Sequence, residues 1–446
     1  MRVLTRGCVT VLVAGALLRG TVSWWTAWGE ALGSRTELAP VVDRLELLRE
    51  TKYLLDTMRV DPASVWSSLT VHHSPLLLLL PDAWVFDARR SAVLWIALDT
   101  ATGAILGAVA SLLAERRGKH WRSLSPAEVV TCYMLNPYAI ACCAAKSTSA
   151  LRALLLAASL LAALRSASAA LAATQAMSSV LFLTPVLFTP ALVLLGADSY
   201  ADYGRWRATF GVRRSDAWAQ FCARTTWRFF AVVVAALVLS AFLSRDGTWR
   251  FLRSVYGTRW VGERDAYLCP SIFVDNLAPS PGLVWYFFVQ MFEHFRAFFV
   301  VVVNAHLCAY VVPVTIKFRD DPVFALTVLS GIQCLFGNYP SMGDTAMFLS
   351  LWSLSCVQLS EYLRYPLVTS MLFAYSTLLM PAFHYLWLYT GSANANFYYA
   401  VNLVHALAIG GLLLDATWAW GRDRWEAERP SAGAADGGVE RLVVQR

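Results

Sequence analysis

Amide and hydroxyl side chains gather in one short polar stretch between two apolar runs near the C-terminus. The stretch covers residues 389–397 and contains Ser392, Asn394 and Asn396. An Asn amide offers both donors and an acceptor, which suits sugar hydroxyls and phosphate oxygens. Ser and Asn beside Gly391 are also ordinary turn formers. We favour a binding role for Ser392, Asn394 and Asn396, with turn formation as the alternative.

A second group of charges interrupts apolar sequence earlier in the chain. Glu293, His294 and Arg296 stand among phenylalanines at the start of a long apolar run. Charges in such sequence are costly in lipid, so they mark a site or a membrane boundary. Helical spacing would place Glu293 and Arg296 on one face as an i,i+3 pair. The group is interpreted either as an ion pair that anchors an interfacial helix or as a contact to a phosphate or a partner subunit.

Three further polar residues lie at the ends of expected helices and are candidate lipid or partner contacts. Asn338 and Asp344 flank a Pro-Gly turn, where capping of a helix by Asp344 alone would explain its presence. Lys146 could meet an anionic phosphate, or it could extend its amine to the membrane surface.

Some ionisable residues lie inside apolar runs and need partners there. Asp99 stands between Leu98 and Thr100, and a buried acid in a membrane usually finds its partner within the bundle. Arg19, in the first apolar run, is one candidate for that partner. His384 and His405 are isolated on apolar faces and are interpreted as core residues with satisfied hydrogen bonds.

The composition defines the class of protein that must position these residues. The chain has 446 residues, of which 57% are hydrophobic and 15% charged. Soluble domains carry about 25% charged residues. Many apolar runs reach the length of a membrane-spanning helix, and no sustained alternation of the kind found in membrane β-barrels occurs. The sequence predicts an all-α, polytopic transmembrane helical bundle.

The placement of Lys and Arg orients this bundle. Arg2 and Arg6 precede the first run, which is expected to remain as an uncleaved anchor in preference to a cleaved signal. The basic clusters agree with about twelve spans and with both termini in the cytosol. Spans are expected at 8–28, 91–113, 127–145, 149–164, 229–243, 296–316, 322–338, 344–360, 366–388 and 397–420, with two short ones within 168–197.

The remaining segments complete the expected organisation of one membrane domain over residues 1–420. Luminal loops are expected near 29–90 and 245–295, and a basic cytosolic loop near 198–228. The short apolar piece after His73 is expected to lie at the membrane interface. The tail 421–446 is polar and glycine-rich and is predicted to be a disordered cytosolic segment. The polar groups described above then all face the lumen.

The cysteines do not indicate a metal or redox site. Nine is an odd number, most of them lie in apolar runs, and Cys142 and Cys143 are adjacent instead of spaced as CxxC. A cysteine nucleophile needs a nearby histidine on an accessible scaffold. Cys269, the thiol placed clearly in a luminal loop, has none near it in sequence. We therefore expect no catalytic residue, metal or cofactor on this chain.

Several motifs in order resemble the PIG-U family, the polytopic subunit of glycosylphosphatidylinositol (GPI) transamidase. In the C-terminal half they are WYFFVQMFEHFRAFF, KFRDDPVF, GNYPSMGD and LWLYTGSANANFYYA. In the N-terminal half, MLNPYAIACCAAKST and HHSPLLLLL are similar to family segments. The loop 246–280 departs from the family because it looks longer than usual.

The resemblance implies a non-catalytic subunit of an endoplasmic reticulum (ER) complex that attaches GPI anchors to proproteins. It implies an architecture like that of the GT-C sugar transferases and a role in binding and positioning the GPI lipid, and also the C-terminal attachment signal. The implied partners are the other transamidase subunits, including a caspase-like cysteine protease that carries the catalytic thiol, the GPI glycolipid, the proprotein signal and membrane lipids, with no nucleic acid.

The alternative is a GT-C mannosyltransferase that uses dolichol-phosphate mannose. Such an enzyme needs a luminal carboxylate, often in a D-x-D motif, as base or cation ligand. No two acidic residues in 29–90 have that spacing, and the nearest match is Glu263-Arg-Asp265. A single Asp could suffice, so this alternative stays open.

Overall fold

Apolar runs of this length fold as helices because a helix satisfies its own backbone hydrogen bonds where no water is present. The computed structural model describes residues 5–24, 26–67, 71, 73–117, 121–200, 216–245, 249–256 and 277–427. Within these ranges every regular element is a helix. The all-α prediction is therefore confirmed. The expectations that fall on His72, 201–215, 246–248, 257–276 and 428–446 lie outside the described residues.

Among the residues that the structure describes, six helical stretches are long and apolar enough to cross a membrane. They are α1 (Arg6–Trp24), α6 (Ala88–Arg117), α12 (Asp216–Leu243), the pair α16 (Glu293–Ala309) and α17 (Val311–Lys317), α21 (Pro366–Leu388) and α22 (Ala395–Ala427). Shorter apolar helices pack among them: α9 (Ser149–Leu164), α10 (Ser168–Phe182), α11 (Thr189–Tyr200), α18 (Pro322–Phe336) and α19 (Met342–Ser353). The protein is a polytopic helical bundle, and the count of about twelve spans stays a prediction.

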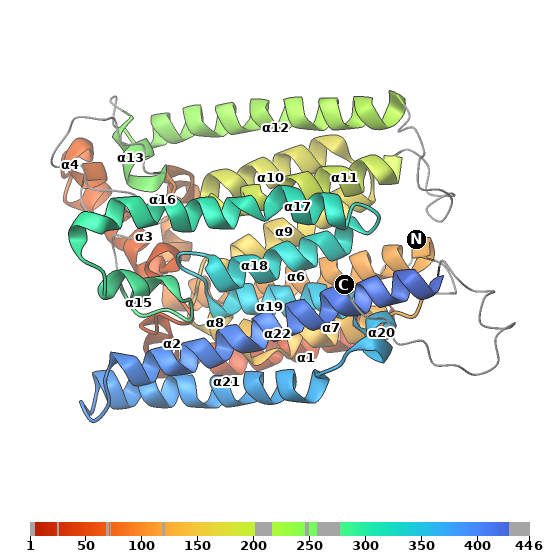
Figure 1. Ribbon diagram of the computed structural model, residues 1–446. Helices are drawn as coiled ribbons and strands as arrows, with labels where there is room; N and C mark the ends of the chain where they lie inside the picture. Colours follow the sequence, from red (N-terminus) through yellow and green to blue (C-terminus); the bar gives the residue numbers. More distant parts are fainter. Residues whose placement is uncertain are drawn as a thin grey trace, which may run out of the picture.

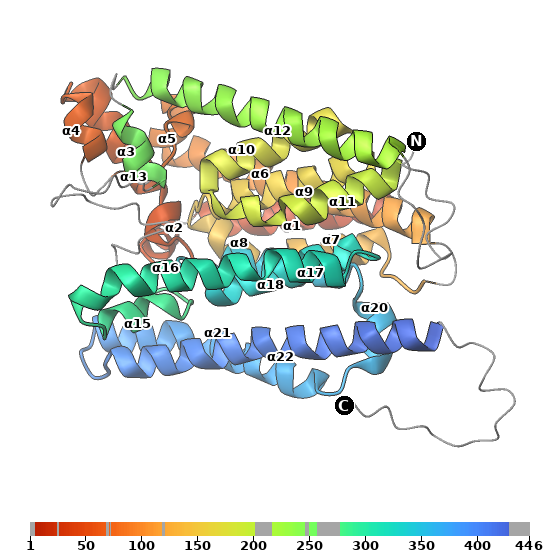
Figure 2. The ribbon, with the colours of Figure 1, turned by 45° about the horizontal axis from the view of Figure 1, so that its top comes forward.

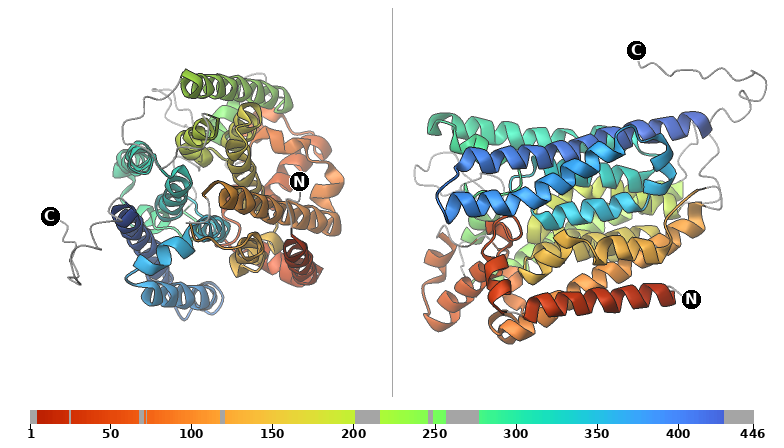
Figure 3. Two further views of the ribbon diagram at one scale, coloured as in Figure 1. Left: turned by 90° about the vertical axis from the view of Figure 1, so that its right-hand side faces the viewer. Right: turned by 90° about the horizontal axis from the view of Figure 1, so that it is seen from below.

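The long helices lie side by side, and the two ends of the bundle differ (Figures 1 and 2). One end, on the left in Figure 1, carries the short helices α3 (Leu45–Lys52), α4 (Pro62–Ser67), α13 (Arg250–Tyr256) and α15 (Val284–Val289). We call this the polar end, and it is the end expected to face the lumen. The start of α1 and the end of α22 both lie at the opposite end (Figure 3).

Glycine allows three helices to approach closely at the centre of the N-terminal half. A Cβ on Gly15 of α1 would lie 2.7 Å from Cε of Met134, and one on Gly103 of α6 would lie 2.7 Å from its Sδ. Met134 ends α7 (Pro126–Met134). Small residues at such crossings are the usual means of bringing membrane helices together.

The same three helices share a buried charge network. Arg19 donates from Nε to the carboxylate of Asp99, and Nη1 donates to the carbonyl oxygen of Met134 at 2.6 Å. The Tyr133 hydroxyl donates to the other oxygen of Asp99. The expected pairing of Asp99 with Arg19 is thus confirmed, and it ties α1 into the bundle.

Several helix boundaries differ from those expected. The run 127–145 is two helices, α7 and α8 (Pro137–Ala144), because Pro137 has no N–H and Asn136 caps the second helix. Helix α12 begins at Asp216, inside the predicted basic loop 198–228, and α22 continues to Ala427, inside the predicted tail 421–446. Beyond residue 420, α22 is joined to neighbouring elements, since Gln358 donates to Asp423 at 2.6 Å and the Tyr362 hydroxyl donates to Glu426 at 2.8 Å. An i,i+4 ion pair between Arg422 and Glu426 adds a small local contribution.

The expected spans at 8–28 and 344–360 are also divided. The first run is α1 followed by α2 (Thr26–Gly33), and α19 is followed by the short α20 (Cys356–Leu359). The apolar piece expected at the interface forms a 3₁₀ helix, η3 (Pro75–Leu79), at the polar end.

Candidate binding site at the polar end

A buried ion cluster joins the first loop to two helices at the polar end. Arg152 of α9 donates from Nη1 and Nη2 to the two carboxylate oxygens of Asp43, at 3.1 and 2.7 Å. It also donates from Nε and Nη2 to Asp344 of α19, at 2.9 and 3.0 Å. We call these three residues the Arg152 cluster. A single guanidinium holds two carboxylates, each in the bidentate geometry that gives the strongest ion pairs.

Both carboxylates have further donors. Thr148 donates its hydroxyl to Asp43 at 2.9 Å and its backbone N–H to the Asp43 carbonyl at 3.0 Å. Asp344 accepts the backbone N–H of Ser341 at 2.9 Å in a capping box at the start of α19. The N-cap of α19 is therefore Ser341 and not Asp344, which lies at the third helical position and completes the capping box. The ion pair with Arg152 adds a second role for Asp344.

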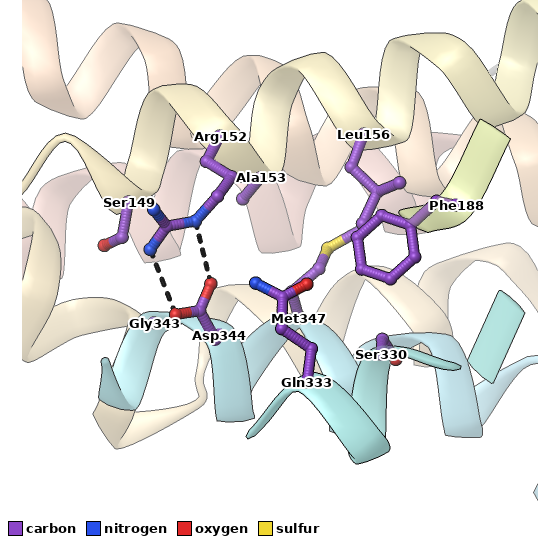
Figure 4. Close-up of a pocket in the computed structure, with 10 residues that line it drawn as sticks. All are labelled: Ser149, Arg152, Ala153, Leu156, Phe188, Ser330, Gln333, Gly343, Asp344 and Met347. Carbon is purple, nitrogen blue, oxygen red and sulfur yellow. Dashed lines mark hydrogen bonds and ion pairs between the residues drawn. The ribbon is translucent and has the colours of Figure 1, made fainter. Parts of the chain in front are cut away.

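A small internal cavity lies beside this cluster (Figure 4). Figure 4 shows Arg152 reaching from α9 to Asp344, with the other lining residues on the same two helices, on α18 and, for Phe188, at the end of the 3₁₀ helix η4 (Thr184–Phe188). The lining residues are Ser149, Arg152, Ala153, Leu156, Phe188, Ser330, Gln333, Gly343, Asp344 and Met347. The cavity has room for about one water molecule. The cavity is too small for a lipid head group. We therefore assign the Arg152 cluster a structural role: it joins the first loop to α9 and α19.

The polar stretch with Ser392, Asn394 and Asn396, which we call the Asn turn, lies exposed between α21 and α22. The side-chain oxygen of Asn394 accepts the backbone N–H groups of Asn396 and Phe397, at 3.0 and 3.3 Å, and so caps α22. The hydroxyls of Ser392 and Thr390 lie 2.7 Å apart. Asn394 therefore has the turn role considered as the alternative, while its amide nitrogen and all three exposed side chains remain open to a ligand.

Aromatic side chains pack directly beneath this turn. Asn396 accepts a hydrogen bond from the Tyr286 hydroxyl of α15. The Tyr286 ring stacks on Tyr399 with centroids 4.2 Å apart, and Trp285 stacks on Trp387 at 6.2 Å. Aromatic faces beside amides suit sugars and cationic head groups. The structure thus brings residues 285 and 286 to the turn, a contact that sequence spacing did not indicate.

The other predicted contacts also lie at the polar end but do not form one site. Glu293, His294 and Arg296 lie in the first turn of α16, and the exposed His294 ring lies against Phe292 and Phe295, with centroids 5.9 and 4.0 Å away. This arrangement is typical of a membrane-interface helix.

Asn338 and Lys146 contact neighbouring elements. The amide of Asn338 donates to the Asn304 side chain at 3.1 Å. Lys146 has a positive φ of 55° and donates from Nζ to the Ala88 carbonyl at 3.3 Å. Partial burial, followed by the nearby Arg49 charge, lowers the pKa of Lys146. Neither residue reaches the Asn turn or the Arg152 cluster through a described contact.

Asp43 and Arg152 are the site residues that the sequence interpretation missed. Arg152 lies in the apolar run 149–164, so the reasoning applied to Arg19 would have marked it as a buried charge. Its partners are 109 and 192 residues away in sequence, and nothing local points to them. Among the residues that the structure describes, no three His, Cys, Asp or Glu side chains group as a metal site.

The fold and this end of the bundle define a multi-span helical protein with buried ion pairs and an exposed polar rim. The sequence pattern of the PIG-U family, described as GPI transamidase subunit PIG-U, matches residues 13–405. The chain belongs to this family.

Relatives over the full length agree with that assignment. The GPI-anchor transamidase component PIGU of Homo sapiens is 28% identical over 464 residues, covering 98% of this chain and 97% of that protein. The same component of Cricetulus griseus is also 28% identical, over 460 residues, with the same coverage. The GPI transamidase component GAB1 of Saccharomyces cerevisiae is 26% identical over 426 residues, covering 95% of each chain.

Proposed function

We propose that this chain is the non-catalytic GPI transamidase subunit that binds and positions the GPI lipid for attachment to proproteins. It also contributes to holding the C-terminal attachment signal. It acts in the ER membrane, with both termini in the cytosol and the polar end in the lumen. Its partners there are the other subunits, including the caspase-like protease that carries the catalytic thiol.

One observation carries the binding role: the exposed amides of the Asn turn lie directly over the aromatic group of α15, α21 and α22. Asn396 is bonded to Tyr286, whose ring stacks on Tyr399 at 4.2 Å. A glycolipid whose tails lie along the apolar flank of α21 would bring its head group to this rim. Holding that head group near the acyl-enzyme raises the effective concentration of the attacking amine.

The state of the first-loop carboxylates supports binding over sugar transfer. A mannosyltransferase needs a luminal carboxylate that is open to the donor. Of the two buried carboxylates in this loop, Asp43 is held on both oxygens by Arg152, and Glu37 is closed off from solvent. The other carboxylates described in 29–90 lie on the outside of the protein.

The test is GPI attachment in cells whose own subunit is replaced by Asn394→Ala with Asn396→Ala. We expect reduced surface display of a GPI-anchored reporter, with the transamidase subunits still co-purifying. Because Asn394 caps α22, a matched variant, Asn394→Ser with Asn396→Ala, keeps a capping oxygen. Attachment should stay impaired in that variant if the amides bind the lipid. Normal surface display in both variants would refute the site.

A further inference from the structure

A second buried cluster at the polar end has polar atoms without hydrogen-bond partners. Within the described residues, both carboxylate oxygens of Glu37, the hydroxyl of Tyr398 and Nδ1 of His384 are buried and make no hydrogen bond of normal geometry. These side chains are 5%, 0% and 4% exposed. We call them the Glu37 cluster. Buried polar groups are almost always satisfied, so each exception needs an explanation.

The three side chains face one another. The Tyr398 hydroxyl contacts the Glu37 carboxylate outside normal hydrogen-bond geometry, and that carboxylate also acts electrostatically on His384. The His384 and Tyr398 rings lie 5.8 Å apart. The three residues come from different parts of the chain. Glu37 lies in a turn of the first loop, His384 in α21 and Tyr398 in α22. A negative group, a hydroxyl and a ring nitrogen thus converge on one point. The earlier expectation that His384 is a satisfied core residue is wrong on this point, whereas His405 does lie within bonding distance of Ser376, at 3.2 Å.

Aromatic rings pack around Tyr398, and one cation lies beside Glu37. The centroids of Trp285 and Trp387 lie 6.0 and 5.9 Å from that of Tyr398. Arg35 lies at the edge, 18% exposed, with Nε 3.4 Å from Glu37, a long contact for a hydrogen bond. A buried carboxylate among aromatic faces is the arrangement that recognises an ammonium group, because ring faces and carboxylate both attract the cation. An adjacent guanidinium suits the phosphate of the same ligand.

We propose that the Glu37 cluster binds the ammonium of a phosphoethanolamine group, with Arg35 at its phosphate. The ammonium supplies three N–H donors to the Glu37 oxygens and to Tyr398 or His384. Arg35, which is 18% exposed, lies at the edge of the cluster where the ligand would enter. This inference rests on the proposed function, since phosphoethanolamine occurs on the GPI glycan; the head group of phosphatidylethanolamine is the other source.

The experiment titrates O-phosphoethanolamine into the purified transamidase complex by isothermal titration calorimetry, with phosphocholine as the comparison ligand. Phosphocholine has no N–H, so we expect binding of phosphoethanolamine alone. Glu37→Gln should weaken that binding at least tenfold, and Glu46→Gln, at an exposed carboxylate of the same loop, should not. Tyr398→Phe should weaken binding without lowering the unfolding temperature. Equal binding of both ligands, or undiminished binding in Glu37→Gln and Tyr398→Phe, would overturn the proposal.

Nanodiscs separate the two sources of the ligand. If phosphatidylethanolamine fills the site, it should compete with the soluble ligand. The complex in nanodiscs that contain phosphatidylethanolamine should then bind O-phosphoethanolamine at least tenfold more weakly than the complex in pure phosphatidylcholine nanodiscs. Unchanged binding assigns the site to the GPI glycan. This result can be told apart from a failure of the proposed function. If the Asn394/Asn396 variants lose attachment but Glu37→Gln binds phosphoethanolamine as well as the parent protein does, only the Glu37 site is refuted.

Discussion

Two buried charged clusters, the Arg152 cluster and the Glu37 cluster, lie at the same end of this bundle. They differ in how many hydrogen bonds and ion pairs their carboxylates make. In the Arg152 cluster, one guanidinium and several donors satisfy both carboxylates. In the Glu37 cluster, the carboxylate has a long contact to Arg35 and a contact to the Tyr398 hydroxyl, and neither has normal hydrogen-bond geometry. Satisfied networks rigidify and specify a fold, whereas unsatisfied ones are costly unless a ligand completes them. The first cluster therefore holds the loop, and the second is suited to binding.

One stretch of chain links the two. Residues 37–43 carry both acidic groups, and the carbonyl of Glu37 accepts the backbone N–H of Met342 at 3.0 Å, close to Asp344. The Arg152 cluster thereby fixes the position of Glu37 over α21 and α22. Any change that releases Asp43 should disturb both clusters, while a change in Glu37 should leave the first intact.

The largest expected effect comes from breaking the Arg152 cluster. Arg152→Met would leave two buried carboxylates without a cation, which costs about 3–5 kcal/mol. We expect a marked loss of folded protein by fluorescence-detected size-exclusion chromatography and a lower unfolding temperature. Arg122→Met, which breaks an exposed ion pair with Glu361, should cost at most about 1 kcal/mol. Replacing all three charges, with Asp43→Asn, Arg152→Met and Asp344→Asn, should recover much of the lost stability; similar losses in Arg152→Met and Arg122→Met would contradict the structural role.

A smaller effect is expected from crowding the same cluster. A Cβ on Gly343 would lie 2.5 Å from the Ser149 Oγ at the start of α9. Gly343→Ala should therefore destabilise by about 1–3 kcal/mol, the usual range for overpacking. Gly410→Ala, whose Cβ would meet Leu335 at an ordinary 3.9 Å, is the matched control and should be neutral or stabilising. Equal unfolding temperatures for the two variants would show that α9 and α19 can separate freely.

A pH effect should follow from His73, which lies beside the Arg152 cluster. Its Nε2 lies 2.7 Å from the Arg44 carbonyl, and burial lowers the pKa of His73 despite the nearby Asp43 charge. The unfolded chain, with a histidine pKa of about 6.5, binds this proton more readily. The stability present above pH 6.5 should therefore fall as the pH drops below it. His73→Gln should flatten this dependence in thermal unfolding from pH 7.5 to 5, and His306→Gln should not.

The sequence predicted the class, the family and much of the helix pattern because these depend on composition and local order. It also indicated Arg19 as one candidate partner of Asp99, since charges isolated in apolar runs have few partners available, but it did not show that the two meet. It did not predict the Arg152 cluster, because Asp43 and Asp344 lie in polar segments where acids are unremarkable. The break at Pro137 was missed because Asn136 and Pro137 are only two residues in a run that is otherwise mostly apolar, so the mean hydropathy of the run stays high.

The Glu37 cluster could not be predicted for a different reason. Whether a buried polar atom lacks a hydrogen bond depends on where its neighbours lie in the folded protein. The residue type alone does not show it. Glu37 is one of several acids in the first loop, and Tyr398 is one of two adjacent tyrosines in NFYYA. Only the folded structure shows that Glu37, among the acids, and Tyr398, of the two tyrosines, are buried side by side.

The smallest expected effect is that of removing the Tyr398 hydroxyl, and it is best measured against the same chemical change at Tyr133. Tyr133 donates its buried hydroxyl to Asp99, so Tyr133→Phe should cost about 1.5–3 kcal/mol, as for other hydrogen bonds to charged groups. Tyr398 is equally buried, but its hydroxyl contacts Glu37 without normal hydrogen-bond geometry, so Tyr398→Phe should leave stability unchanged or raise it by up to about 1 kcal/mol.

Thermal unfolding of the two purified variants beside the parent protein makes this comparison directly. Both substitutions remove one oxygen from a buried ring, so differences in volume and hydrophobicity cancel. A loss in Tyr133→Phe alone would show that the Glu37 cluster keeps an uncompensated hydroxyl in the ligand-free fold. Equal losses would mean that the Tyr398 hydroxyl already has a partner, such as an ordered water, and the reason for a ligand at Glu37 would then disappear.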